Sequence, residues 1–180
     1  MRATDTKELI VEAALALAAE RGFTATSVDD IAAKAGVAKG SIFYNFGSKA
    51  ALFDEIIGQG VGRLTAALRS ASDGLHGRPA LEALVAELLT QIQAHPDFAK
   101  LMVAETFRTG RSWQDSIRLV RDESMGAFAA VVAETWPDRD PSLTAAALFG
   151  ATLLAGLEWL VFQPDRTIED VRAAVLVTLR

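Results

Sequence analysis

Apolar side chains recur every three or four residues along most of the chain, which is the spacing of helices that bury one face. No segment alternates apolar and polar residues with the period of two that a half-buried strand would show. Glycine, proline and capping residues separate the apolar runs from one another. The pattern therefore predicts an all-α chain of about nine helices without a strand.

The helices near the N-terminus are expected to be short and closely spaced. Ser27 and Asp30 have the spacing of a capping box at the start of the second helix, and Gly36 interrupts its apolar pattern. A short third helix is expected over about 39–44, followed by a long fourth helix that begins near Lys49. Two short helices joined by a tight turn that contains glycine form a helix-turn-helix.

The rest of the chain shows longer amphipathic runs. Residues 73–79 are expected to form the first linker, because they contain two glycines and a proline. Asp140 and Thr167 are expected to cap the last two helices. The sequence therefore predicts two domains, a helix-turn-helix domain over residues 1–50 and a helical domain over residues 51–180.

The composition argues against most catalytic and metal-binding chemistry. The chain contains no cysteine, which excludes disulfides, thiolate zinc sites and cysteine nucleophiles. Its two histidines, His76 and His95, are more typical of a linker and a helix terminus than of a metal site. The sequence shows no glycine-rich phosphate-binding loop. We therefore expect no metal ion, no cofactor and no catalytic residues, and a small helical enzyme is only a remote alternative.

The sequence favours a cytoplasmic location. Its first residues include charged side chains of both signs and do not form a secretory signal. The longest uncharged run, Pro141–Leu157, is shorter than a membrane span and is followed by Glu158. We expect a cytoplasmic protein that does not enter the membrane.

The distribution of charge along the chain differs from its net charge of −5. Between Asp30 and Asp54 the charged residues are Lys34, Lys39 and Lys49, with no acid among them. A basic segment within an acidic chain favours contact with nucleic acid at this point, although three lysines are also common on a solvated surface.

The same segment resembles the DNA-binding domain of the tetracycline-repressor (TetR) family. The similarity covers roughly residues 6–55 without a gap, and it includes the run Phe-Tyr-Asn-Phe-Gly-Ser-Lys at residues 43–49. The resemblance implies a helix-turn-helix whose third helix contacts the bases of DNA. The core that fixes this helix is expected to contain Phe23, Ile31, Ala32, Val37, Ile42 and Phe46.

The family pattern implies DNA contacts for nine residues. Three match positions that face bases or nearby phosphates: Lys39, Ser41 and Asn45. Three match positions that contact the sugar-phosphate backbone: Phe43, Tyr44 and Lys49. Two match positions at the start of the second helix that contact phosphate: Thr26 and Ser27. Gly40 has no side chain, so the backbone can approach the duplex closely.

Some of these residues have an alternative role or depart from the family pattern. Ser27 is equally expected as a plain N-cap, and one hydroxyl group can fill both roles. Lys49 in a first helical turn opposes the helix dipole, so a phosphate partner is favoured over a solvated lysine. Phe43 and Asn45 stand where the family frequently has tyrosine and histidine, which leaves the operator sequence open.

Beyond residue 55 the resemblance is looser and implies dimerisation through the last two helices. Small residues recur in the penultimate helix, and in the family these two helices form a four-helix bundle across a two-fold axis. The expected interface residues are Ala147, Gly150, Ala151, Ala155, Val171 and Val175. The alternative is that such residues belong to the core of one chain.

The middle helices are expected to form a chamber for a small apolar effector. The resemblance implies the chamber, and the large side chains on these helices suit an apolar pocket. Its lining is expected to include Phe98, Met102, Glu105, Phe107, Trp113, Ile117 and Phe128. For any one of the apolar residues, a place in the core is the simpler interpretation. Glu105 is either a polar anchor for the ligand or a buried partner of an arginine such as Arg108.

The sequence as a whole predicts a DNA-binding transcriptional regulator. We expect a repressor that binds a palindromic operator as a homodimer and that a small apolar effector releases from DNA. The alternative is an architectural or partner-controlled DNA-binding protein without a small-molecule effector.

Overall fold

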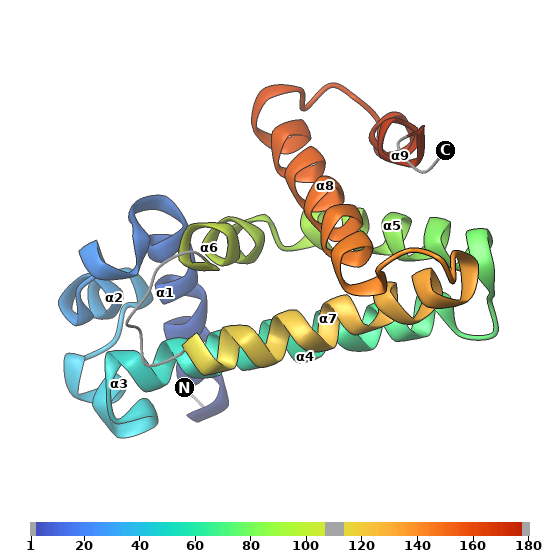
Figure 1. Cartoon of the computed structure of the whole chain (residues 1–180). Helices are drawn as coiled ribbons and strands as arrows, with labels where there is room; N and C mark the ends of the chain where they lie inside the picture. Colours follow the sequence, from blue (N-terminus) through green and yellow to red (C-terminus); the bar gives the residue numbers. More distant parts are fainter. Residues whose placement is uncertain (1–2, 107–113, 178–180) are drawn as a thin grey trace. The chain divides into compact units, whose positions relative to one another are not determined.

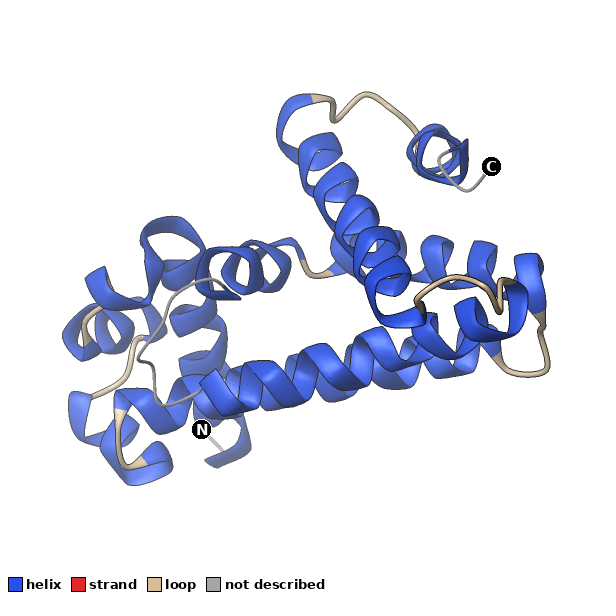
Figure 2. Cartoon of the chain, viewed as in Figure 1, coloured by secondary structure: helices blue, strands red, loops and turns tan. Residues whose placement is uncertain are grey.

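The computed structural model describes residues 3–106 and 114–177. Within these ranges it describes only the backbone of residues 3–5, 106, 114–117 and 119–121. The described residues contain nine helices and no strand (Figure 1, Figure 2). The helices are α1 (Ala3–Ala25), α2 (Val28–Ala35), α3 (Lys39–Phe46), α4 (Lys49–Ser72), α5 (Gly77–Ala94), α6 (Pro96–Thr106), α7 (Gln114–Thr135), α8 (Pro141–Phe162) and α9 (Ile168–Val177). The all-α prediction is confirmed.

Glycine and proline decide two of the helix boundaries. Gly22 has a φ of 82° and a ψ of 161°, so the regular part of α1 ends there. The linker predicted over residues 73–79 is shorter than expected, because α5 already begins at Gly77. Pro79 lies in the first turn of α5, where the missing N–H of a proline removes no helical hydrogen bond.

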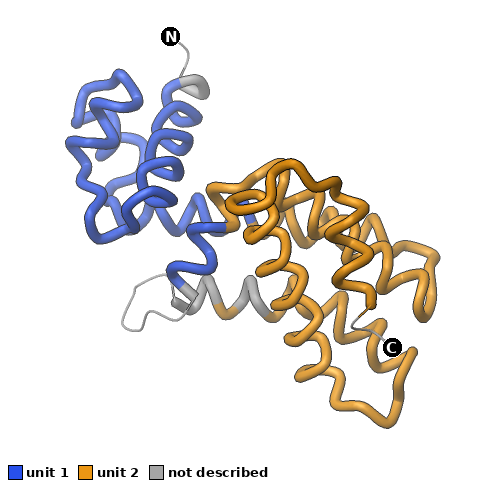
Figure 3. The backbone as a smooth tube through the Cα atoms, turned by 90° about the horizontal axis from the view of Figure 1, so that it is seen from above, with its two compact units in different colours: residues 1–60, 100–117 blue, residues 61–99, 118–180 orange. Residues whose placement is uncertain are grey.

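The chain divides into two compact units (Figure 3). The first unit contains residues 1–60 and 100–117, and the second contains residues 61–99 and 118–180. This division differs from the functional boundary expected at residue 50, because the first unit also includes the beginning of α4 and a segment that follows α5 in the sequence.

The first unit has a small apolar core in which α1, α2 and α3 contact one another. Phe23 packs edge-on against Phe53 of α4, with ring centroids 4.7 Å apart. Five of the six core residues predicted from the sequence are buried: Phe23, Ile31, Ala32, Ile42 and Phe46. The sixth, Val37, is only partly buried. The predicted core of the helix-turn-helix is therefore largely confirmed.

The second unit is built around α5, which packs against α8 and α9. Gly156 allows α8 to approach α5 closely, since a Cβ atom at this position would lie 2.9 Å from Ile92 Cδ1. Trp159 is buried, and its Nε1 donates to the Arg166 carbonyl at 2.9 Å, which links α8 to the turn before α9. The unit thus has a core of its own, with α5 covered by the two last helices.

The apolar helix α8 is long enough, by length and composition alone, to cross a membrane. The helix is longer than the uncharged run Pro141–Leu157, because it continues through Glu158 to Phe162. The core helix of a protein outside a membrane satisfies the same criterion. Here α8 buries Ala145, Leu148 and Trp159 in the core of the second unit, which accounts for part of its apolar character.

Candidate nucleic-acid interface

A capping box between Ser27 and Asp30 fixes the start of α2. The Ser27 hydroxyl accepts from the Asp30 backbone N–H at 3.0 Å and donates to Asp30 Oδ2 at 2.7 Å, and the Ser27 N–H donates to the same oxygen at 3.1 Å. Hydrogen bonds from the Ser27 side chain and backbone, followed by the charge of Arg21, hold the pKa of Asp30 below its ordinary value. The N-cap role of Ser27 is confirmed.

Gly36 makes the turn between α2 and α3. Its φ of 66° and ψ of 32° are left-handed, a conformation in which a side chain would be strained. Its N–H donates to the Ala33 carbonyl, and the Val37 N–H donates to the Ala32 carbonyl at 3.0 Å. These bonds close the end of α2 so that α3 begins only three residues later, at Lys39. The predicted helix-turn-helix is therefore present.

The short helix α3 has one buried face and one exposed face. Ile42 and Phe46, four residues apart, are buried in the first unit. The other side presents two aromatic residues to solvent, Phe43 with 46% and Tyr44 with 88% of its surface exposed. An aromatic ring as exposed as that of Tyr44 gains nothing from the fold, so a surface that contacts a partner explains it better.

The N-terminus of α3 is uncovered. Ala38 at the N-cap has no side-chain hydrogen bond to the first turn. A Cβ atom added to Gly40 would have no atom within 4 Å, so the space in front of this turn is open. Backbone N–H groups at such a helix terminus suit a phosphate oxygen.

Two side chains expected to contact DNA are engaged with the protein's own backbone. Asn45 Nδ2 donates to the Ser41 carbonyl at 2.7 Å, so this amide folds back onto α3. Thr26 is fully buried, and its hydroxyl donates to the Gly22 carbonyl at 2.9 Å. A phosphate contact by the Thr26 side chain does not fit this position, and that expectation is corrected to a role in closing the corner between α1 and α2.

Lys49 ties the start of α4 to the end of α1. Its Nζ donates to the Phe23 carbonyl at 3.0 Å and to the Thr26 carbonyl at 2.8 Å, and it lies 4.0 Å from the centroid of the Phe23 ring. The cation at the first turn of α4 therefore has partners within the protein. The phosphate contact expected for Lys49 stays a prediction, but the helix dipole argument no longer requires it.

Comparison with known proteins supports this interpretation of the helix-turn-helix. Residues 10–56 match the family model of bacterial regulatory proteins of the tetR family. The transcriptional repressor KstR2 of Rhodococcus jostii is 40% identical over 86 residues, which make up 47% of this chain and 42% of the repressor. The chain spans less than half the length of the curated relatives that it matches.

Two solved structures extend the similarity to the whole chain. A TetR-like transcriptional regulator from Rhodococcus sp. RHA1 has a TM-score of 0.82 and 25% identity, over 97% of this chain and 93% of its own. The regulator FadR of Bacillus subtilis, solved in complex with stearoyl-CoA, has a TM-score of 0.80 over 96% of each chain, and at 17% identity this likeness shows the fold alone.

Residues 10–56 form a helix-turn-helix domain of the TetR family, and the chain as a whole is similar to TetR-like transcriptional regulators. Its helix-turn-helix is the DNA-binding domain of this family, and the relatives with which it shares that domain are regulators of transcription.

One residue of the TetR-type domain that the sequence pattern does not single out is Asp29. Both of its carboxylate oxygens lie 2.9 Å from Lys39 Nζ. The basic segment identified in the sequence lies between Asp30 and Asp54, so it does not include Asp29. The pairing depends on the turn at Gly36, which brings residues ten positions apart together.

The face of α8 turned away from the core of the second unit is apolar. Leu143, Leu154 and Phe162 are 73%, 67% and 75% exposed. Three of the expected interface residues are exposed on this helix: Ala147, Gly150 and Ala151. A fourth, Ala155, is partly buried. The two expected on α9, Val171 and Val175, are buried in the core of the second unit. Val171 also lines the groove between α8 and α9, and an interface role of these two residues stays a prediction.

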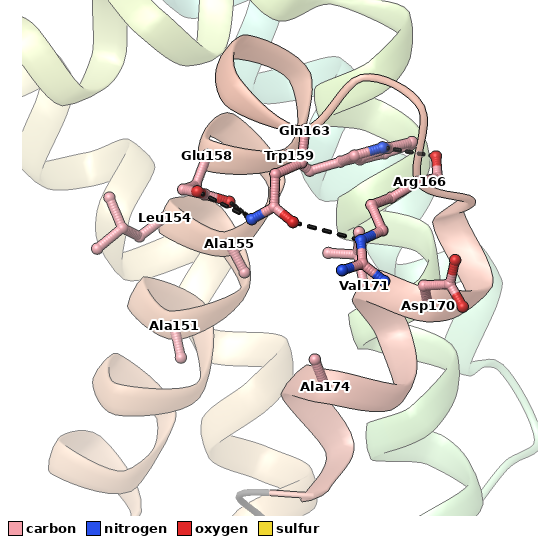
Figure 4. A pocket seen from close by; sticks show the side chains of 10 residues that line it. All are labelled: Ala151, Leu154, Ala155, Glu158, Trp159, Gln163, Arg166, Asp170, Val171 and Ala174. Carbon is pink, nitrogen blue, oxygen red and sulfur yellow. Dashed lines mark hydrogen bonds between the residues drawn. The ribbon is translucent and has the colours of Figure 1, made fainter.

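A groove of about 560 Å³ lies between α8 and α9 (Figure 4). Its apolar lining includes Ala151, Leu154, Ala155, Trp159, Val171 and Ala174. Figure 4 shows Gln163 between two charged residues of the polar lining, donating to Glu158 at 2.9 Å and accepting from Arg166 Nε at 3.3 Å. The groove continues the exposed apolar face of α8, because Ala151 and Leu154 belong to both.

The expected effector-chamber residues fall into three groups. Phe98 and Phe128 are buried in the second unit, where Phe128 packs edge-on against Phe149 at 5.9 Å and so belongs to its core. Met102 and Glu105 belong to the first unit, where Glu105 is almost completely buried. The remaining expected residues lie outside the described part of the chain: Phe107, Trp113 and the side chain of Ile117.

The contacts of Lys49 lead to a prediction about stability. Lys49→Met keeps most of the aliphatic chain and removes the ammonium group, so the Phe23 and Thr26 carbonyls lose a charged donor. We expect the free energy of unfolding to fall by roughly 1–3 kcal/mol, measured by urea denaturation followed by far-UV circular dichroism. Lys34→Met is the matched control, since Lys34 is exposed at the end of α2. Equal denaturation midpoints for the two variants would refute the structural role.

Proposed function

We propose that this protein is a homodimeric repressor in the cytoplasm, that it binds a palindromic operator through α3, and that a small apolar effector releases it. The observation that supports DNA binding most directly is the exposed face of α3. Tyr44 and Phe43 stand in solvent there, on a helix whose N-terminal turn at Gly40 is uncovered. Its opposite face is anchored by Ile42 and Phe46.

The dimensions and chemistry of α3 suit the major groove of DNA. The groove is about 12 Å wide and admits one α-helix, whose N-terminal residues reach the base edges. Lys39 and Ser41 lie in the first turn of α3 and would face bases or nearby phosphates. Tyr44 would place its hydroxyl against a phosphate, which fixes the register of the helix on the duplex.

Repression by a dimer is supported by a relative and by the surface of α8. The relative KstR2 is named a transcriptional repressor. The exposed apolar face of α8 and the groove beside it leave apolar surface in contact with water, which is unfavourable. A second copy of the chain would cover both. A two-fold dimer presents two copies of α3, which matches an operator with two half-sites at a fixed spacing.

Control by an apolar effector is supported by the family and by the large apolar residues of the middle helices. FadR, which has the same fold, was solved with stearoyl-CoA, a molecule with a long acyl chain. An effector of this class would bind the DNA-free conformation more tightly than the DNA-bound one. By linkage it would then weaken operator binding by the same factor, typically about 5–150-fold.

The proposed contact of α3 with DNA leads to a prediction about DNA affinity. Tyr44→Ala should weaken binding to an operator selected from a random duplex library by roughly tenfold or more, because a hydrogen bond to a charged group is worth about 1.5–3 kcal/mol. Tyr44→Phe removes only the hydroxyl and should reproduce most of this loss. Leu75→Ala, a truncation of an exposed side chain before α5, is the control. Fluorescence anisotropy gives the affinities, and unchanged binding by Tyr44→Ala would exclude α3 as the DNA-contacting helix.

The proposed dimer leads to a prediction about assembly. Ala151→Arg should convert the dimer into a monomer in sedimentation velocity at micromolar concentration, because it brings a bulky charged side chain into a mainly apolar interface. Ala133→Arg makes the same change at an exposed position of α7 and should leave the dimer intact. A wild-type protein that sediments as a monomer would contradict the dimer, as would an Ala151→Arg protein that remains dimeric.

The proposed effector leads to a prediction about release from DNA. Stearoyl-CoA or another long-chain acyl compound should raise the melting temperature and release operator DNA, whereas coenzyme A alone should do neither. The release should amount to a loss of operator affinity of about 5–150-fold. If a library of hydrophobic ligands produces neither effect, the protein is instead a DNA-binding protein controlled by a partner or by none.

A further inference from the structure

An acid of the preceding helix holds Lys39, the first residue of α3. The Lys39 Nζ lies 2.9 Å from Asp29 Oδ1 and 2.9 Å from Asp29 Oδ2. Asp29 is the second residue of α2, so the ion pair bridges the turn of the helix-turn-helix. The side chains are 52% and 71% exposed. The pair therefore lies on the surface, next in sequence to the uncovered turn at Gly40.

The ion pair contributes little to the fold at this corner. The capping box of α2 is made by Ser27 with Asp30, and Asp29 takes no part in it. An exposed lysine–aspartate pair is weak, because water and salt screen it and two flexible side chains must be ordered. A stronger anionic partner can therefore displace the Asp29 carboxylate from Lys39 without disturbing the helices.

The charge of the domain makes this exchange matter for DNA binding. Between Thr26 and Lys49, three lysines and two aspartates leave one net positive charge, on a chain whose net charge is −5. Arg21, the next basic residue toward the N-terminus, is engaged with Asp30 at 3.2 Å. When Lys39 moves to a phosphate, the Asp29 carboxylate stays close to it and repels the phosphate charge.

We propose that Asp29 limits the affinity of this regulator for DNA by competing with a backbone phosphate for the ammonium group of Lys39. The inference rests on the proposed function, since it requires α3 to face DNA. The competition involves charge and no base, so it lowers the affinity for DNA of any sequence. Because the affinities for the operator and for non-specific sites fall by the same factor, the ratio between them is unchanged.

Removing the charge of Asp29 tests the proposal. Asp29→Asn keeps the size of the side chain and should lower the Kd for a random-sequence duplex by roughly three- to tenfold at about 0.1 M salt. The plot of log affinity against log salt concentration should become steeper, by a part of the roughly 0.9 that one full phosphate contact contributes on duplex DNA, because competition with Asp29 leaves this contact only partly formed in the wild-type complex. Fluorescence anisotropy over about 50–200 mM NaCl gives both quantities, since one contact changes the affinity about 3.5-fold over this range.

Two further variants show whether Asp29 acts through Lys39. Lys39→Gln should weaken binding and make the salt dependence shallower, by less than about 0.9 in the wild-type background and by about 0.9 in the Asp29→Asn background. In the Lys39→Gln background, Asp29→Asn should no longer make the salt dependence steeper. Asp73→Asn makes the same charge change at an exposed position in the second unit and should alter neither quantity. Melting temperatures and circular dichroism confirm that each variant is folded.

The possible results separate this inference from the proposed function. If Lys39→Gln weakens binding but Asp29→Asn changes nothing, α3 still faces DNA and the role of Asp29 is refuted. If Asp29→Asn tightens binding equally with and without Lys39, the acid only repels phosphate and the competition is refuted. If Lys39→Gln itself leaves affinity and salt dependence unchanged, the placement of Lys39 against DNA is wrong, and the inference falls with it.

Discussion

The surface that we propose contacts DNA depends on the burial of two side chains, Ile42 and Phe46. They lie four residues apart on α3, in a core where this helix contacts α1 and α2. A helix of eight residues is too short to be stable through its own hydrogen bonds. Its position therefore comes from this packing and from the turn at Gly36. Because one face is buried, the opposite face is left to solvent, and Tyr44 is exposed there.

Two lysines of the TetR-type domain have different kinds of partner. Lys49 is turned inward, where two carbonyl oxygens and the ring of Phe23 receive its ammonium group. Lys39 is turned outward and forms an exposed ion pair with the Asp29 carboxylate, which another anion can displace. The difference follows from their surroundings. Backbone carbonyls at the end of α1 are fixed acceptors, whereas the side chain of Asp29 lies in water and is easily replaced.

The two sides of helix α8 have different surroundings. Toward α5 it presents Gly156, whose lack of a side chain allows the two helices to approach. Away from the core it presents Leu143, Leu154 and Phe162, which the described residues of the second unit leave exposed. A helix that is apolar on nearly all sides needs partners on most of them. This is why the same segment satisfies the length and composition of a membrane span while forming part of a folded core.

The sequence by itself determined what depends on neighbouring residues: the all-α class, the capping box of Ser27, the turn at Gly36 and the similarity to the TetR family. These follow from local hydrogen bonds and from the period of the apolar positions, which a single segment contains. Only the tertiary structure decided three other features: the Asp29–Lys39 pair, the burial of Thr26, and the clamp in which Lys49 Nζ donates to the Phe23 and Thr26 carbonyls. The clamp joins residues up to 26 positions apart, and Thr26 is buried by packing of the whole unit. No local pattern records which side chain such contacts bring together, because the fold of the backbone between them selects the partner.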